Sequence, residues 1–310
     1  MPSTNRPRVV AIVGPTASGK TAAAIEVARH VRAEVINADS RQVRAEMVIG
    51  TAAPTEGERA AVPHHVLGVA APDVPWAITD WLSLARASVF EVAARDALPL
   101  VVGGTGQYVW ALLEAWDVPA VPADAAFRAE WEAFAATEGH QALHDRLRAL
   151  DPASAERIDA RNVRRVVRAL EIVEATGVPV PPLAPRDPGF DWRVVGMRWS
   201  RDALHRRADE RVEAMFASGL LEETRALVDR HGRTFEAIRS IGYREALAVL
   251  DGEMTRGQAV ERTKIETHRL IRMQANWFRD DDPRIHWVPG EDLEAVVQAV
   301  LAGVVDGTSG

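Results

Sequence analysis

The chain has 310 residues, of which 47% are hydrophobic and 26% are charged, a mixture typical of a globular α/β domain that carries a second, smaller unit. It contains no cysteine, which excludes disulfides, cysteine-bound zinc, iron–sulfur clusters and thiol nucleophiles. Its formal net charge of −7 argues against a protein that coats nucleic acid, although net charge does not exclude a local basic face.

The predicted elements alternate between strands and helices. Buried apolar runs predict strands at residues 9–13, 34–38, 98–102, 192–197 and 285–288. Apolar spacing predicts helices at residues 21–32, between 76 and 97, and at 201–218, 220–230 and 255–279. This alternation predicts a parallel sheet of about five strands flanked by helices.

Residues 118–178 contain no convincing strand and several helical stretches, and they are followed by the proline-rich linker GVPVPPLAPRDPG. We therefore expect a catalytic domain at residues 1–117 and 191–310 and an inserted all-helical subdomain at 118–190. The first residues, MPSTNRPRVV, lead into a strand pattern without the apolar core of a signal peptide, and no run of about 18 apolar residues follows. We expect no membrane association and a cytoplasmic location.

The sequence GPTASGKT at residues 14–21 matches G-x-x-x-x-G-K-[ST] between a predicted strand and a predicted helix, which predicts a P-loop NTPase-like fold. Backbone N–H groups of such a loop surround phosphate oxygens, Lys20 neutralises their charge, and the Thr21 hydroxyl is placed to contact Mg²⁺. The predicted diphosphate-binding residues are Gly14, Pro15, Thr16, Ala17, Ser18, Gly19, Lys20 and Thr21. ATP is the commonest occupant of this kind of loop, but the loop says little about the group attached to the phosphates.

Two other predicted strands end in polar or glycine-rich segments, ADSRQ at residues 38–42 and GGTGQY at residues 103–108. The carboxyl ends of parallel strands meet at one edge of a sheet, so we expect both segments beside the phosphate loop. Either segment alone is weak evidence, because an Asp after a strand is often a cap and a glycine pair is often only a turn. Together with the loop they are much more specific.

In these motifs the chain resembles the tRNA dimethylallyltransferases, also called tRNA isopentenyltransferases. The matching segments are GPTASGKT, ADSRQV, IGTAAP, PHHVL, GGTGQYV, RNVRRVVRALEI, SIGYREAL and QANWF, in register from about residue 12 to residue 288. The resemblance implies that the loop holds dimethylallyl diphosphate in place of ATP. It also implies transfer of the allyl group to N6 of the adenine at tRNA position 37, just 3′ of the anticodon, in tRNAs reading codons that begin with U. The implied partner is the tRNA anticodon stem-loop, and the implied state is a monomer.

The chemistry of this reaction agrees with the residues present. An adenine amino group is a poor nucleophile that needs a base or a very electrophilic carbon, and the resemblance assigns the base to Asp39. An allylic diphosphate ionises if its leaving group is stabilised, here by Lys20, the loop amides and a Thr21-bound Mg²⁺. The resemblance adds Thr105 as a catalytic residue that contacts the tRNA and Arg244 as a further diphosphate contact.

A candidate tRNA face lies in the predicted insertion. Its arginines are spaced i, i+3, i+4 and i+7, which predicts one shared helix face: Arg161, Arg164, Arg165 and Arg168. A solvated surface helix would explain this spacing as well, but the resemblance favours contacts to tRNA phosphates and adds Arg128. The target adenine must leave its stack, at a cost on the order of a few kcal/mol, so contacts near Asp39 are expected from Ser40, Arg41 and Gln42.

The chain departs from the family pattern DSMQVYRGMDIGTAKP at several positions: Arg44 replaces its tyrosine, Glu46 its glycine, Val48 its aspartate and Ala53 its lysine. Three alternatives stay open at this point. They are an adenylate isopentenyltransferase acting on free AMP, ADP or ATP, a small-molecule kinase with the same loop, and a non-catalytic RNA-binding protein.

Overall fold

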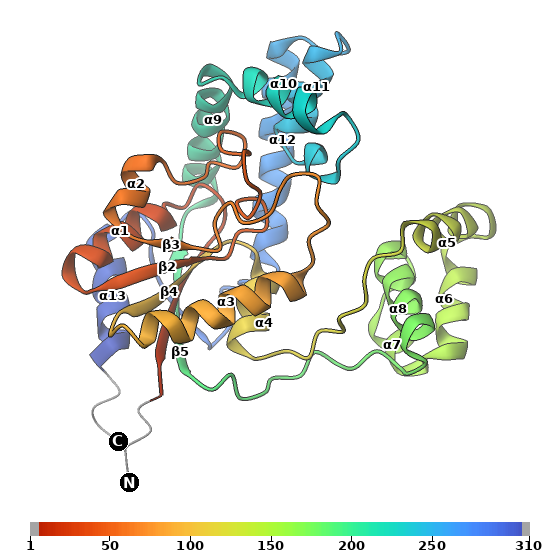
Figure 1. Ribbon diagram of the computed structural model, residues 1–310, viewed down its shortest axis with the longest axis horizontal. Helices are drawn as coiled ribbons and strands as arrows, with labels where there is room; N and C mark the ends of the chain where they lie inside the picture. Colours follow the sequence, from red (N-terminus) through yellow and green to blue (C-terminus); the bar gives the residue numbers. More distant parts are fainter. Residues whose placement is uncertain (1–5, 306–310) are drawn as a thin grey trace. The chain divides into compact units, whose positions relative to one another are not determined.

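The structure, a computed structural model, describes residues 6–305 and divides the chain into two compact units (Figure 1). The first unit takes in the described parts of Met1–Trp76, Asp80–Leu113 and Asp187–Gly310, and the second takes in Ala77–Thr79 and Glu114–Arg186. The second unit overlaps the predicted insertion at residues 118–190. Residues 1–5 and 306–310 of the predicted catalytic domain lie outside the described residues.

The first unit is built on a six-stranded parallel sheet with the order β3-β2-β4-β1-β5-β6. Its strands are β1 Arg8–Val13, β2 Ala33–Asn37, β3 His64–His65, β4 Leu98–Gly103, β5 Asp191–Arg198 and β6 Ile285–Pro289. The predicted fold class is confirmed, and all five predicted strands are present. The sixth, β3, was missed because two residues are too short to show a periodic pattern.

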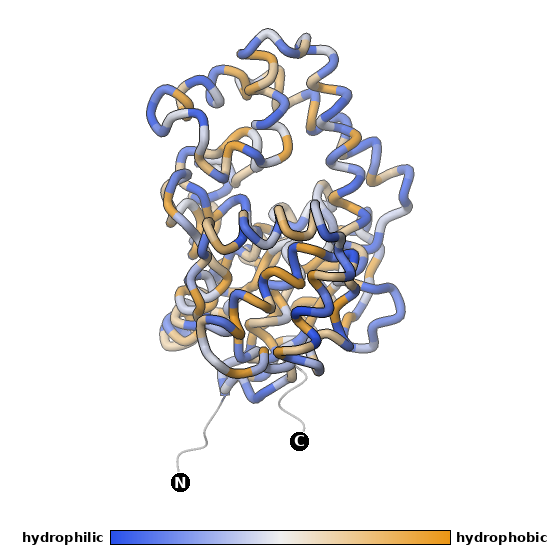
Figure 2. Tube along the Cα trace, turned by 90° about the vertical axis from the view of Figure 1, so that its right-hand side faces the viewer, coloured by the Kyte–Doolittle hydropathy of each residue, from blue (hydrophilic) through white to orange (hydrophobic). Residues whose placement is uncertain are grey.

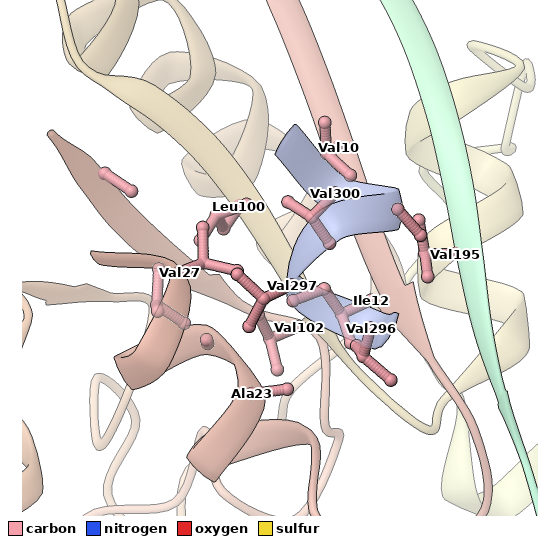
Figure 3. Close-up of a cluster of buried hydrophobic side chains, with 14 of the residues drawn as sticks. Val10, Ile12, Ala23, Val27, Leu100, Val102, Val195, Val296, Val297 and Val300 are labelled. Carbon is pink, nitrogen blue, oxygen red and sulfur yellow. The ribbon is translucent and has the colours of Figure 1, made fainter. Parts of the chain in front are cut away.

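Alternate residues of β1, β2 and β4 fill the core on one face of the sheet. On this face, Val10 and Ile12 of β1 pack with Val195 of β5 against helices α1 (Lys20–His30) and α13 (Leu293–Val305) (Figure 3). Each such buried aliphatic side chain contributes on the order of 2 kcal/mol.

The other face of the sheet is covered by helices α3 (Ile78–Ala93) and α4 (Gly106–Leu113). Trp81 of α3 donates its indole N–H to the Asn37 carbonyl and stacks on Tyr108 of α4 at a centroid distance of 4.5 Å. Trp110 of α4 meets Trp192 of β5 edge to face at 6.1 Å. These aromatic contacts fix the position of α4, and with it the glycine-rich turn that precedes it.

Four helices that follow β5 in the first unit lie close together (Figure 1). They are α9 Arg201–Ala217, α10 Leu220–His231, α11 Tyr243–Leu250 and α12 Arg256–Ala275, with a short 3₁₀ helix at Glu236–Arg239. Their shared core contains Val212, Phe216, Leu220, Leu227 and Tyr243. The helix α2 (Glu56–Ala61) lies earlier in the chain and begins with a capping box between Thr55 and Glu58. These helices matter here because α9 and α12 supply walls of the candidate site.

The described part of the second unit is helical. Its helices between residues 114 and 186 are α5 Ala125–Glu138, α6 His140–Leu150, α7 Pro152–Arg157 and α8 Val163–Thr176. Apolar and polar residues alternate along these helices, as along those of the first unit (Figure 2), which is the pattern of amphipathic helices. Leu143 and Leu147 of α6 pack against Val166 and Leu170 of α8, and all four are fully buried.

Candidate active site

The phosphate loop follows β1 and ends at α1. Ala17 and Gly19 both have left-handed backbone conformations, with φ values of +66° and +94°, and Gly19 is the N-cap of α1. The Lys20 ammonium folds back over the loop and donates to the carbonyls of Gly14 at 3.0 Å and Pro15 at 2.8 Å. The loop and the N-terminus of α1 therefore form the cationic, amide-lined turn that binds anions.

A cavity of about 580 Å³ opens beside this loop. Lys20 and Thr21 line it together with Arg207 and Arg211 of α9. Burial lowers the pKa of Lys20 to about 8, an effect that Asp39 opposes and Arg211 strengthens. Burial also lowers the pKa of Arg211, with a further contribution from Arg207. Three cations facing one cavity predict an anionic ligand that would offset their mutual repulsion.

The two arginines of α9 were missed from the sequence, although their i, i+4 spacing would have shown that they share a helix face. Arg244, which the resemblance suggested as a diphosphate contact, is placed elsewhere. Its guanidinium pairs with Glu245, with an Nε to Oε1 distance of 2.9 Å, and approaches Glu266. Among the described residues, it is not part of the lining of either cavity of the site. The diphosphate contact of Arg244 stays a prediction, and Arg211 lines both cavities.

A second cavity, of about 300 Å³, adjoins the first. Thr16, Ala17, Asp39 and Arg211 line both cavities, so Asp39 lies where the two meet. The rest of the second lining is mostly uncharged and includes Ser40, Thr105, Ser240, Met273 and Trp277. The carboxylate thus stands between a cationic cavity and one suited to a flat, uncharged group.

The two segments expected beside the loop do lie together. Thr105 Oγ1 accepts the Ser40 N–H at 2.9 Å and lies 3.3 Å from Ser40 Oγ. A Cβ on Gly103 would overlap the Ala38 carbonyl, so only glycine allows β4 to end this close to β2. The joint prediction from ADSRQ and GGTGQY is therefore confirmed as geometry.

One buried side chain links this turn to the phosphate loop. The Gln274 amide at the end of α12 donates to the Gly104 carbonyl at 3.1 Å and accepts the Thr16 N–H at 2.8 Å. Gln274 belongs to the QANWF segment that carries the family resemblance, but the sequence did not predict which groups it contacts.

The residues after Asp39 have defined partners. The Asp39 carboxylate accepts the Arg41 N–H at 2.8 Å, which orients it from its own turn. The Arg41 guanidinium donates to Ser240 Oγ at 3.1 Å. Gln42 donates from its amide nitrogen to the carbonyls of Thr51 and Ala52, so that nitrogen holds the protein's own loop. The predicted tRNA contacts of Ser40, Arg41 and Gln42 stay predictions.

The arginines of the helical unit fall into two groups. Arg128 and Arg168 both pair with Glu171, whose side chain is 3% exposed, and the Arg128 contacts measure 2.9 and 2.8 Å. Burial opposes ionisation of Glu171, but hydrogen bonds from Arg128, the Asp124 N–H and Arg168 outweigh it and lower the pKa of Glu171 to about 2. These two arginines therefore stabilise the helical unit itself.

The other arginines of the row lie at the surface. Arg164 and Arg165 are exposed on the first turn of α8. Arg161 precedes the N-cap Asn162 and pairs with Asp159 at 2.6 Å. The prediction of one shared helix face is wrong for Arg161, because the helix begins after it. The tRNA contacts predicted for all of these arginines remain untested predictions.

Donor atoms that suit Mg²⁺ are present in the larger cavity. The Thr21 hydroxyl lines the same cavity as the Asp39 carboxylate, and both offer the hard oxygen ligands that Mg²⁺ prefers. Within residues 6–305, no group of three or more acidic or histidine side chains could hold a metal. A cation at Thr21 would therefore take most of its ligands from a bound diphosphate and water. Over the same residues, no helix has the length and apolar character needed to cross a membrane.

The family model described as IPP transferase matches residues 42–281 of the chain, and the one described as Isopentenyl transferase matches residues 7–63. The chain belongs to the IPP transferase family. A relative named tRNA dimethylallyltransferase from Chloroflexus aurantiacus is 43% identical over 91% of this chain and 96% of its own. Another of that name, from Geobacillus kaustophilus, is 41% identical over 90% of both chains. The crystal structure of a tRNA isopentenylpyrophosphate transferase from Bacillus halodurans is 35% identical, covers 97% of this chain and 98% of its own, and has a TM-score of 0.71.

The four named departures from the IPP transferase pattern fall in the segment between β2 and α2. Glu46 replaces a glycine and keeps a glycine-like φ of +64°, and its carboxylate pairs with Arg230 and His231. The Arg44 guanidinium donates to the carbonyls of Ala71 and Val74. Val48 is exposed. Val48, in place of the aspartate, and Ala53, in place of the lysine, both line the larger cavity. Relative to the family pattern, the lining of this cavity therefore lacks one acidic and one basic side chain.

Proposed function

We propose that the chain transfers the dimethylallyl group of dimethylallyl diphosphate to N6 of the adenine at position 37 of tRNA, releasing diphosphate. The observation that carries this proposal is the position of Asp39 at the junction of a cationic cavity and a smaller one whose lining is mostly uncharged. The names of the two relatives and of the Bacillus halodurans structure support the same activity, on proteins 35 to 43% identical to this chain.

The larger cavity is the donor side in this proposal. The amides at the N-terminus of α1, the Lys20 ammonium and the Arg211 guanidinium bind the diphosphate. They neutralise the charge that grows on the leaving oxygen as the allylic carbon–oxygen bond breaks. Mg²⁺ held by the Thr21 hydroxyl and the diphosphate would supply further neutralisation. Burial lowers the pKa of Lys20, and a bound diphosphate would favour its protonated form and so offset that effect.

The smaller cavity is the acceptor side. An adenine that leaves its stack in the anticodon loop enters between Thr105, Met273 and Trp277, and its N6 faces Asp39. The carboxylate accepts a proton from N6 as the nitrogen bonds to the allylic carbon, so no cationic amine accumulates. Thr105 holds Ser40 and thereby keeps the turn that carries Asp39 in place.

The tRNA anticodon stem-loop is the proposed macromolecular partner. Arg164 and Arg165, both exposed on the first turn of α8, are suited to contact its phosphates. The proposal further includes a monomeric protein that acts in the cytoplasm. An adenylate isopentenyltransferase is less well supported, because the relatives that align along nearly the whole chain, helical unit included, are named as tRNA enzymes.

The test is an assay with purified protein, dimethylallyl diphosphate and Mg²⁺, offered either unmodified tRNA or free AMP. We expect dimethylallyladenosine in the nuclease digest of the tRNA, detected by its mass, and no product from AMP. Asp39→Asn should lower the transfer rate by at least roughly 100-fold, because it removes the base, and should leave tRNA binding intact. Efficient prenylation of AMP, or a full rate for Asp39→Asn, would contradict the proposal.

A further inference from the structure

Two side chains outside the motifs hold the back of the phosphate loop. The Trp199 indole N–H, between β5 and α9, donates to the Ser18 carbonyl at 3.0 Å. The Arg207 Nε–H, on α9, donates to the Ala17 carbonyl at 2.8 Å. The two side chains also stack on each other, with the guanidinium carbon 4.4 Å from the indole centroid. They form a single unit, the Trp199–Arg207 brace.

The brace contacts the part of the loop that has the least intrinsic stability. Ala17 has a φ of +66°, a conformation that costs a non-glycine residue on the order of 1 kcal/mol. Such a conformation persists only when its surroundings enforce it. The two bonded carbonyls are those of Ala17 and the next residue, so the brace fixes the peptide planes on the carboxyl side of the strained position.

The direction of these two carbonyls sets the direction of the N–H groups in the same peptides. In a trans peptide the C=O and N–H bonds point in opposite directions. Because the Ser18 carbonyl is held toward Trp199, the Gly19 N–H is directed away from it, at the start of α1 where the anion site lies. If either peptide rotated, a carbonyl oxygen would turn into the cradle and repel the diphosphate.

Arg207 is suited to this task in a way that lysine is not. Its planar guanidinium stacks on the Trp199 indole and donates from Nε to the Ala17 carbonyl. Its Nη2 atom lies near Gly19, 3.5 Å from the position that a Cβ on Gly19 would occupy. A lysine would keep a positive charge beside the cavity but could not stack in plane and donate at once.

We propose that Trp199 and Arg207 are positioning residues, which preset the phosphate loop for diphosphate by holding the carbonyls of Ala17 and Ser18 outward. This inference rests on the proposed function for the identity of the ligand. The inference does not require transfer of the dimethylallyl group to tRNA, because the geometry of the loop alone determines diphosphate binding.

The test compares Trp199→Phe, which keeps an aromatic ring but removes the N–H donor, with Arg207→Lys, which keeps the charge but removes the stacked donor. Binding of inorganic pyrophosphate with Mg²⁺ is measured by calorimetry without tRNA, and KM values for dimethylallyl diphosphate and tRNA are measured separately. We expect each variant to weaken pyrophosphate binding about five- to ten-fold, the effect of one lost hydrogen bond. KM for the diphosphate should rise by the same factor, and KM for tRNA should not change.

The matched control is Trp287→Phe. Trp287 is also half-buried, also lies under an arginine, Arg198, at 5.4 Å, and also donates to a backbone carbonyl, that of Arg279 at 3.3 Å. It lies on β6 and is not part of the loop contacts, so pyrophosphate binding should match that of the unaltered protein.

Unchanged pyrophosphate binding in both brace variants would overturn the inference, as would an equal loss in Trp287→Phe. A parallel rise in KM for tRNA would also overturn it, because that outcome indicates general destabilisation. If the unaltered protein binds pyrophosphate but prenylates no tRNA, the proposed function fails while the brace is still tested by the binding data.

Discussion

Replacing Glu171 with glutamine should unfold the helical unit more readily. Glu171 is nearly fully buried and pairs with Arg128 and Arg168, and its pKa falls from the ordinary value of 4.5 to about 2. A difference of about 2.5 pKa units at 1.36 kcal/mol each corresponds to roughly 3 kcal/mol of stability at neutral pH. Because the pKa is depressed, this contribution is present above about pH 4.5 and is lost as the pH falls toward 2. Glu171→Gln removes it at every pH.

The assay is hydrogen exchange of the full chain at pH 7, followed by mass spectrometry on peptides from residues 125–176. A loss of roughly 3 kcal/mol should speed exchange of the slowest amides there about 100-fold. The control is Asp159→Asn, which removes the exposed partner of Arg161 and should leave exchange unchanged, since surface pairs contribute little. Equal exchange for Glu171→Gln and the unaltered protein, or an equal effect of Asp159→Asn, would refute the reasoning.

Three further predictions concern the ligands. Because Lys20 has a pKa of about 8, it is charged below that pH and neutral above it, so kcat/KM for dimethylallyl diphosphate should fall about ten-fold per pH unit above 8. Lys20→Arg should abolish that fall. Arg211→Gln should lower kcat/KM for the diphosphate by roughly 30-fold, the effect of a charged hydrogen bond, whereas Arg244→Gln should leave it nearly unchanged; equal losses would support Arg244 as a contact. Arg164→Ala with Arg165→Ala should weaken tRNA binding and flatten its dependence on salt in filter-binding titrations, and an unchanged slope would mean that these side chains are only solvated.

The sequence was sufficient for the centre of the site because that centre is set by strand ends. The phosphate loop, Asp39 and the turn at Gly103 each follow a buried strand, and parallel strands deliver their carboxyl ends to one edge. No knowledge of distant contacts was needed to bring them together. The short strand β3 could not be predicted, because two residues are too few to show an alternating pattern.

Contacts between distant segments were not predictable. Arg211 reaches the phosphate cavity from α9, far along the chain, and nothing local to it says which way that helix faces. Arg128 and Arg168 looked like surface charges because burial cannot be read from charge spacing. The available signal was Glu171, an acid three residues after Arg168 on the otherwise apolar side of α8.

The Gln274 amide governs how the site responds to movement. Because one side chain holds both the phosphate loop and the turn after Gly103, a displacement of α12 carries the donor and acceptor halves along together. The distance between the allylic carbon and adenine N6 should therefore change little when α12 moves. Loss of this amide would leave the pairing of β1 with β4 to hold the two halves together.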